Sequence, residues 1–179
     1  ETSTRGSLIT IGEGSFIDSF VKFKAAGGSG NITIGRNVYI NSGCVLYVGN
    51  GISIGDNVSI AANCVLAPTN HQISDGDLPH QNQGFMASRG GIRIEEDVWI
   101  GALTVLLDGA VCSRGSVVGA GSVVREKLES YGIYVGNPLR LVGHRNKASY
   151  QNRPDSSAVG SSDSSSEQSL SSSSNETAR

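Results

Sequence analysis

Aromatic residues and prolines are scarce in this 179-residue sequence, which has four Phe, five Tyr, one Trp and four Pro. A core built on aromatic side chains would need more of them. Basic residues are not concentrated anywhere and the net charge is -2 at pH 7, so we expect no nucleic-acid partner. The longest apolar stretch, residues 98–111, is interrupted by Asp108 and is too short to cross a bilayer, so we expect no membrane span.

Cysteine is equally sparse. Cys44, Cys64 and Cys112 suggest neither a disulfide framework nor a Cys-x-x-Cys metal site. We interpret them as small buried residues of a protein in a reducing compartment, which favours a cytoplasmic location. Glycine, by contrast, is abundant at 24 residues, and Val and Ile are frequent. This combination predicts short strands joined by tight corners.

Apolar residues recur every six positions, a period that neither an α-helix nor a single strand produces. The repeating positions are Ile34, Ile40, Leu46, Ile54, Ile60 and Leu66 in one block, and Ile94, Ile100, Leu106, Cys112, Val118 and Val124 in another. Such a period predicts a β-solenoid in which three hexads form one triangular coil. We expect about five coils over residues 9–127, with Cys44 stacked on Cys64.

The period fails over residues 67–91, which are polar and too long for a corner, so they predict a protruding functional loop. It fails again after Val124. We therefore expect an N-terminal extension at residues 1–8, a closing segment at 128–148 and a disordered Ser-rich tail at 149–179.

Three motifs carry a resemblance to a known family. They are residues 94–102 (IEEDVWIGA), 117–124 (VVGAGSVV) and 135–138 (VGNP), in that order. Over about residues 9–143 the chain resembles the hexapeptide-repeat acyltransferases, in the branch of the galactoside and maltose acetyltransferases and the sugar O-acetyltransferases of surface polysaccharides. The resemblance implies a left-handed parallel β-helix and a homotrimer whose active sites lie between subunits.

The resemblance also implies the chemistry, which is transfer of an acetyl group from acetyl-CoA to a sugar hydroxyl, without a metal. A hydroxyl is a weak nucleophile, so a base must take its proton as it attacks the thioester. His71 occupies the family's place for that base, where the loop leaves the coil. Asn41, Asp75 and Gln83 resemble positions that bind the acceptor or close the loop, and the acceptor is expected to be a surface polysaccharide or its precursor.

The same resemblance assigns a set of donor-binding residues. Small corner residues would let the backbone approach the pantetheine arm, and arginines would meet the CoA phosphates. The matching positions are Gly101, Ala102, Gly119, Ala120, Arg125 and Arg140.

Three other functions remain open at this point. The first is N-acetylation of an amino sugar on a nucleotide, and the second is a non-catalytic solenoid scaffold. The third is a γ-type carbonic anhydrase, which needs three histidines around a metal, whereas here only His71 ends a coil. A test of CoA binding would separate the scaffold from the transferases, and metal titration would separate the anhydrase.

Overall fold

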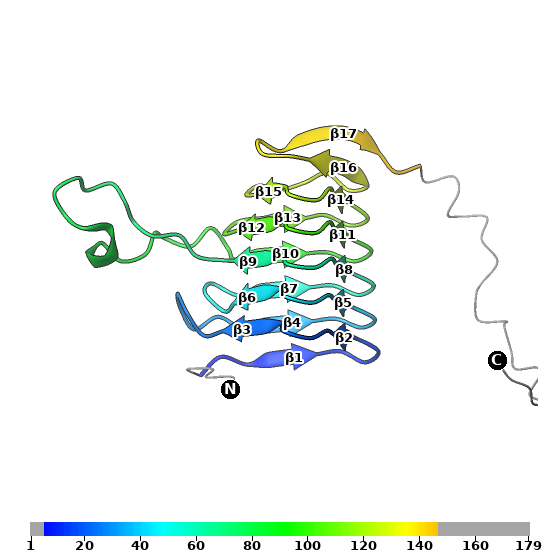
Figure 1. The fold of residues 1–179 in the computed structure, drawn as a ribbon, viewed down its shortest axis with the longest axis horizontal. Coiled ribbons are helices and arrows are strands. Elements are labelled where there is room, and N and C mark those ends of the chain that lie inside the picture. The colour runs from blue at the N-terminus through cyan, green and yellow to red at the C-terminus, as the bar shows by residue number, and fades with distance from the viewer. Residues whose placement is uncertain (1–5, 147–179) are drawn as a thin grey trace, which may run out of the picture. The chain divides into compact units, whose positions relative to one another are not determined.

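The computed structural model describes residues 6–146, and they form the left-handed parallel β-helix that the sequence predicts (Figure 1). Sheet A consists of β1 (Ile9–Ile11), β4 (Ile32–Ile34), β7 (Ile52–Ile54), β10 (Ile92–Ile94) and β13 (Val111–Cys112). Sheet B consists of β2 (Phe16–Ile17), β5 (Tyr39–Ile40), β8 (Ser59–Ile60), β11 (Trp99–Ile100), β14 (Val117–Val118), β16 (Gly132–Val135) and β17 (Arg140–His144). Sheet C consists of β3 (Lys22–Lys24), β6 (Val45–Tyr47), β9 (Val65–Ala67), β12 (Val105–Leu107) and β15 (Val123–Val124).

Each coil gives one strand to each sheet in turn, so the five strands of sheets A and C correspond to the five expected coils. We number the coils 1 to 5 from the N-terminus. The inward residues stack in register, with Ile34 paired with Ile54 and Ile54 with Ile94. The ladder continues one level beyond coil 5, because β16 pairs in parallel with β14. The antiparallel strand β17 then covers β16 and ends the stack.

The repeating apolar residues form the core. The hexad residues from Ile34 to Val124 are at most 3% exposed, which confirms their inward orientation. The small residues four positions later are also buried, as at Ala110 and Ser116. Cys44 and Cys64 are free, buried and adjacent in the stack, since Val45 pairs with Val65. Burial raises the pKa of the Cys112 thiol to about 12.

The outer faces of the sheets differ in polarity. Sheet A presents polar residues such as Thr33, Ser53 and Arg93. From coil 2 onward, sheet C presents an apolar face formed by Val45, Tyr47, Val65, Ala67, Val105, Leu107 and Val123. Larger apolar side chains are exposed at the corner where sheet B passes to sheet C, where Phe20 is 82% exposed and Leu103 is 63% exposed.

One long insertion leaves this scaffold between coils 3 and 4. The 24 residues between Ala67 and Ile92 project from the corner where sheet C passes to sheet A, here called the C–A corner (Figure 1). Their only regular element is the 3-10 turn η1 (His80–Asn82). The predicted tail at 149–179 lies outside the described residues, as do residues 1–5 of the extension and 147–148 of the closing segment.

Candidate active site

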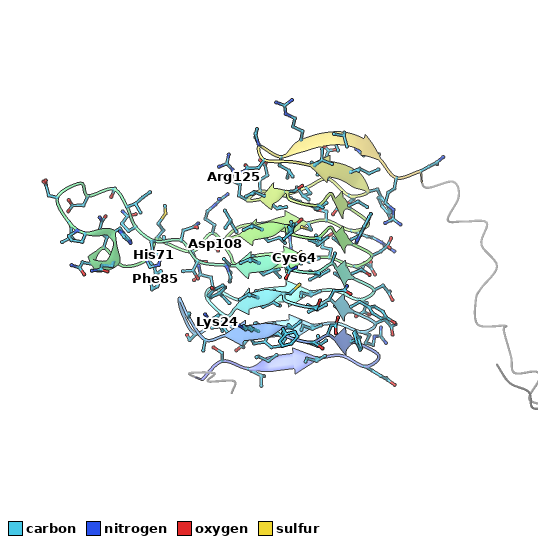
Figure 2. The ribbon with its side chains drawn as sticks, viewed as in Figure 1. Lys24, Cys64, His71, Phe85, Asp108 and Arg125 are labelled. Atoms are coloured by element: carbon cyan, nitrogen blue, oxygen red, sulfur yellow. The ribbon has the colours of Figure 1, made fainter. Side chains whose placement is uncertain are left out.

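His71 lies four residues after β9, at the neck of the projecting loop (Figure 2). It forms an antiparallel bridge with Phe85, where the loop returns. Two backbone hydrogen bonds flank the bridge, from Met86 to the Asn70 carbonyl at 2.8 Å and from Gln72 to the Gly84 carbonyl at 3.1 Å. The neck therefore fixes the backbone of His71 although the loop is otherwise irregular.

The imidazole of His71 is exposed and packs against an aromatic ring. The ring centroids of His71 and Phe85 lie 4.6 Å apart at an interplanar angle of 40°. Within residues 6–146, no hydrogen bond involves either imidazole nitrogen. The ring is thus positioned by packing, and its nitrogens are available to an incoming ligand.

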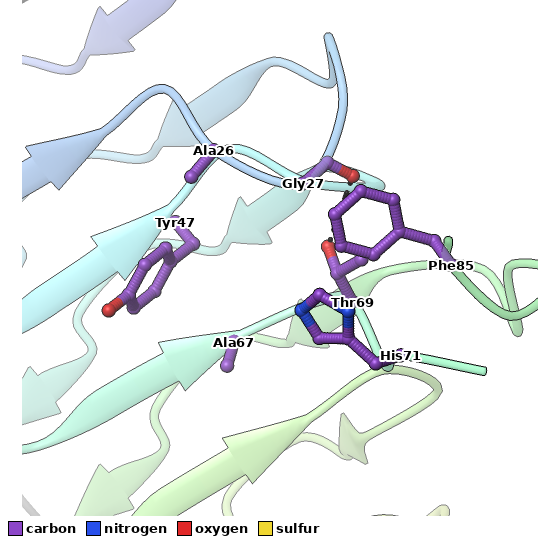
Figure 3. A pocket seen from close by; sticks show the side chains of 7 residues that line it. All are labelled: Ala26, Gly27, Tyr47, Ala67, Thr69, His71 and Phe85. Atoms are coloured by element: carbon purple, nitrogen blue, oxygen red, sulfur yellow. Dashed lines mark hydrogen bonds between the residues drawn. The ribbon is translucent and has the colours of Figure 1, made fainter. Parts of the chain in front are cut away.

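A hollow of about 180 Å³ opens beside this ring (Figure 3). Tyr47 and Phe85 form aromatic walls, and the rest of the lining is small or apolar apart from Thr69 and His71. The lining residues are Ala26, Gly27, Tyr47, Ala67, Thr69, His71 and Phe85. We call this hollow the His71 pocket. Its shape and lining suit one compact ligand placed against the imidazole.

Gln83 and Asp75 lie farther out in the loop and interact with each other. The Gln83 side-chain amide donates to the carbonyls of Asp75 at 2.8 Å and Leu78 at 2.7 Å, and its oxygen accepts the Asp75 N–H at 3.1 Å. The Asp75 carboxylate accepts the N–H of Asp77 at 2.9 Å. These contacts hold the loop tip closed, and contact of either residue with an acceptor stays a prediction.

The returning end of the loop is anchored by a residue that the sequence reading did not select. Asp108 follows β12 and is 2% exposed. Its two carboxylate oxygens accept the N–H groups of Arg89 at 2.7 Å and Gly91 at 2.9 Å. The signal for this role was the single acidic residue inside the apolar stretch 98–111.

The predicted donor-binding glycines stack in a column at the corner between sheets B and C, here called the B–C corner. The Gly101 N–H donates to the Val118 carbonyl and the Gly119 N–H to the Tyr134 carbonyl, each at 2.7 Å. A Cβ on Gly101 would lie 2.5 Å from the backbone nitrogen of Ala120. Stacking of the next coil therefore requires glycine at position 101 whether or not CoA binds there. Contact with CoA stays a prediction for this column, which also includes Ala102 and Ala120.

Asn41 belongs to the same B–C corner, two coils below Gly101. Its side-chain amide donates to the Ile60 carbonyl at 2.9 Å, and within residues 6–146 its side-chain oxygen accepts no hydrogen bond. Asn41 precedes β6, whereas His71 follows β9 in the same sheet. The two residues therefore lie at opposite ends of the sheet C strands, Asn41 at the B–C corner and His71 beyond the C–A corner.

The predicted site residues therefore fall into two groups, one near His71 at the C–A corner and one with Asn41 and Gly101 at the B–C corner. One chain does not bring these two groups together. Arg125 follows β15 and shares the C–A corner with His71. Arg140 pairs with Val135 in the closing hairpin, at the top of the B–C column.

The remaining histidines lie apart from these groups. His80 is in η1 near the loop tip, and His144 contacts Glu129 at 3.2 Å. Residues 6–146 contain no cluster of three His, Cys, Asp or Glu side chains that could hold a metal ion. No helix in the same range is long and apolar enough to span a membrane.

Comparison with known proteins gives sequence relatives, although no protein-family model matches the chain. A Staphylococcus aureus (strain COL) protein named as an acetyltransferase is 41% identical over 112 residues, which cover 63% of this chain and 54% of that protein. The chain thus matches about half the length of this staphylococcal relative. The galactoside O-acetyltransferase of Escherichia coli K12 is 34% identical over 147 residues, covering 79% of this chain and 69% of that enzyme.

Solved structures give the same picture. The N-acyltransferase AntD from Bacillus cereus, in complex with dTDP and 3-hydroxybutyryl-CoA, matches with a TM-score of 0.68 and 26% identity over 82% of this chain and 79% of that one. A hexapeptide-repeat acetyltransferase from Vibrio cholerae, complexed with acetyl-CoA, matches with a TM-score of 0.65 and 27% identity over 78% of this chain and 70% of that one.

Proposed function

Because this chain belongs to the hexapeptide-repeat acetyltransferases, we propose that it transfers an acetyl group from acetyl-CoA to a sugar hydroxyl, with His71 as the general base. The observation that carries this proposal is the His71 imidazole, which is held at the loop neck beside a ligand-sized pocket and has no hydrogen-bond partner within residues 6–146.

The proposed reaction needs no covalent acyl-enzyme. A nitrogen of neutral His71 accepts the proton of the acceptor hydroxyl as its oxygen attacks the thioester carbon. The tetrahedral intermediate then expels the CoA thiolate, and the imidazolium of His71 transfers its proton to that thiolate. Packing against Phe85 would hold the imidazole in one orientation throughout.

We further propose that each active site combines two chains of a homotrimer. The placement of Asn41 and His71 at opposite ends of the sheet C strands supports this, because one chain then presents them to different sides of the sheet. The apolar outer face of sheet C and the exposed Phe20 and Leu103 side chains provide surfaces suited to burial between subunits.

A second candidate function is N-acylation of an amino sugar carried on a nucleotide. It is supported by the likeness to AntD, an N-acyltransferase whose structure contains dTDP. An amine also has to lose a proton on acylation, so the proposed role of His71 would be unchanged. The identity of the best acceptor distinguishes the two functions.

The test is acceptor-dependent release of CoA from acetyl-CoA, measured with sugars, amino sugars and nucleotide sugars. His71→Ala should lower kcat by about a hundredfold or more while leaving the affinity for acetyl-CoA unchanged. His80→Ala is the matched control, because it removes an exposed histidine elsewhere in the same loop. Full activity of His71→Ala would contradict the mechanism, and a wild-type protein that fails to bind CoA would point to the scaffold function.

Mixing two inactive variants tests the shared site. Asn41→Ala and His71→Ala subunits should regain activity when they are unfolded, mixed and refolded together. Random trimers would contain intact pairs at about a quarter of their sites if each site takes one residue from each of two neighbours. No recovery in mixtures that refold to trimers would contradict the two-chain site.

A further inference from the structure

The His71 pocket and the predicted donor residues lie on opposite sides of His71 along the axis of the solenoid. The donor positions Gly101, Gly119 and Arg125 belong to coils 4 and 5. The pocket lies on the other side, since Tyr47 is in coil 2 and Gly27 joins coils 1 and 2. If the donor occupies those positions, as the proposed function requires, the pocket is available for the acceptor.

The strand leading into the pocket carries two positive charges. Lys22 and Lys24 point outward from β3, and Lys24 stacks below Tyr47 in sheet C. The Lys24 ammonium lies 5.6 Å from the centroid of the Tyr47 ring, a wall of the pocket (Figure 2 labels Lys24 and Figure 3 shows Tyr47). Neither lysine forms an ion pair within residues 6–146.

The same outer face carries no acidic residue that would neutralise these charges. Every strand of sheet C presents aliphatic or aromatic residues outward except β3, which presents the two lysines. Asp108, which directly follows β12, accepts two backbone N–H groups and is 2% exposed. An anion that reaches Lys24 would therefore meet no competing carboxylate on this face.

We propose that the His71 pocket binds an anionic sugar, with the ring between Tyr47 and Phe85 and a phosphate or carboxylate substituent at Lys24. The C–H face of a pyranose is apolar and packs on aromatic rings, while its hydroxyls stay at the edge, where His71 can reach one. An exposed ammonium suits a phosphate or carboxylate because it offers three donors and a compact charge.

The CoA phosphates are the competing anions for Lys24. Coil 1 and coil 5 are four strand spacings apart, about 19 Å, so Lys24 and Arg125 would not serve the same phosphate group. The donor positions extend away from Lys24, towards coil 5 and the closing hairpin. A role for Lys24 in donor binding would appear as a change in the affinity for acetyl-CoA.

Binding measurements test the proposal without requiring turnover. Titrations would compare glucose with glucose 1-phosphate, and galactose with galacturonate, on wild type and on Lys24→Gln. We expect at least one anionic sugar to bind wild type about fivefold or more tightly than its neutral counterpart, and Lys24→Gln to abolish that preference. Lys127→Gln is the matched control, because it removes the same charge from an exposed position at the far end of the solenoid.

Kinetics separate this proposal from the proposed function. With an anionic acceptor, Lys24→Gln should raise the acceptor KM about fivefold and leave kcat and the KM for acetyl-CoA unchanged. Equal binding and equal kcat/KM for neutral and anionic sugars would overturn the anionic-acceptor proposal while leaving the acetyltransferase proposal intact. A raised KM for acetyl-CoA would also overturn it, since Lys24 would then serve the donor.

Discussion

Replacing Asp108 by Ala should detach the returning end of the loop and destabilise the solenoid at coil 4. The substitution removes an acceptor that binds the N–H groups of Arg89 and Gly91 at 2.7 and 2.9 Å. The buried N–H of Gly91 would lose the acceptor it has within residues 6–146, whereas Arg89 is exposed and water can replace its partner.

The magnitude follows from the burial of these groups. A hydrogen bond to a charged acceptor contributes about 1.5–3 kcal/mol, and a buried donor left without a partner costs about 1–3 kcal/mol. Because Asp108 is 2% exposed, solvent screens these bonds little. We count the whole contribution of the buried Gly91 bond and only part of the contribution of the Arg89 bond, which water can replace. The free energy of unfolding should then fall by about 3 kcal/mol.

Urea unfolding and amide hydrogen exchange measure the two parts of this effect. Exchange should accelerate more at Arg89 and Gly91, which also gain a local opening, than at the ladder amides of Ile54 and Ile100, which exchange through wider unfolding. Asp56→Ala is the control, because Asp56 also accepts a backbone N–H but does so at an exposed corner, and it should cost much less. Unchanged exchange at Gly91 together with an unchanged free energy of unfolding would refute the anchoring role of Asp108.

Three further predictions concern the scaffold. Leu66→Ala should cost about 2–5 kcal/mol in chemical unfolding because Leu66 is 0% exposed, and a loss below about 1 kcal/mol would contradict tight coil packing. Gly101→Ala should cost about 1–3 kcal/mol because its Cβ would lie 2.5 Å from the nitrogen of Ala120, whereas Gly143→Ala, with no heavy atom within 4 Å, should cost far less. The free energy of unfolding should fall as the pH rises above about 8.5. The Cys112 thiol of the unfolded chain loses its proton there, whereas the folded thiol, with a pKa of about 12, keeps it. A Cys112→Ala variant that shows the same alkaline loss would refute this.

The repeating core could be predicted from the sequence because the hexad period reports a local property. Each inward position, such as Ile60 or Leu106, is apolar whatever lies far away in the sequence, and stacking on the neighbouring coils then follows. Ile34 and Ile54, which occupy equivalent places in two successive coils, pair directly. The neighbouring positions of Cys44 and Cys64 followed from the same register.

The site was harder to predict because the path of the loop, which the repeat does not determine, brings its residues together. His71 could be placed from the end of the hexads, but Phe85 reaches it only through the bridge that closes the loop neck. Gln83 matched a ligand-binding or loop-closing position, and the structure shows its amide bonded to the loop backbone. Lys24 and Tyr47 belong to the regular repeat, so nothing in the period distinguished them from other outward residues.

The loop can interrupt the solenoid because the register resumes unchanged on either side of it. Ile54 pairs with Ile94 as Ile34 pairs with Ile54, so coils 3 and 4 stack as if the 24 intervening residues were absent. Closing a loop of that length costs about 3 kcal/mol by the logarithmic loop-closure relation. The bonds at the neck and the Asp108 anchor are of the same order, so together they offset that cost. It follows that Asp108→Ala should loosen the loop around Arg89 before it separates the coils, and that shortening the loop tip between Asp75 and Gln83 should leave the coil register intact.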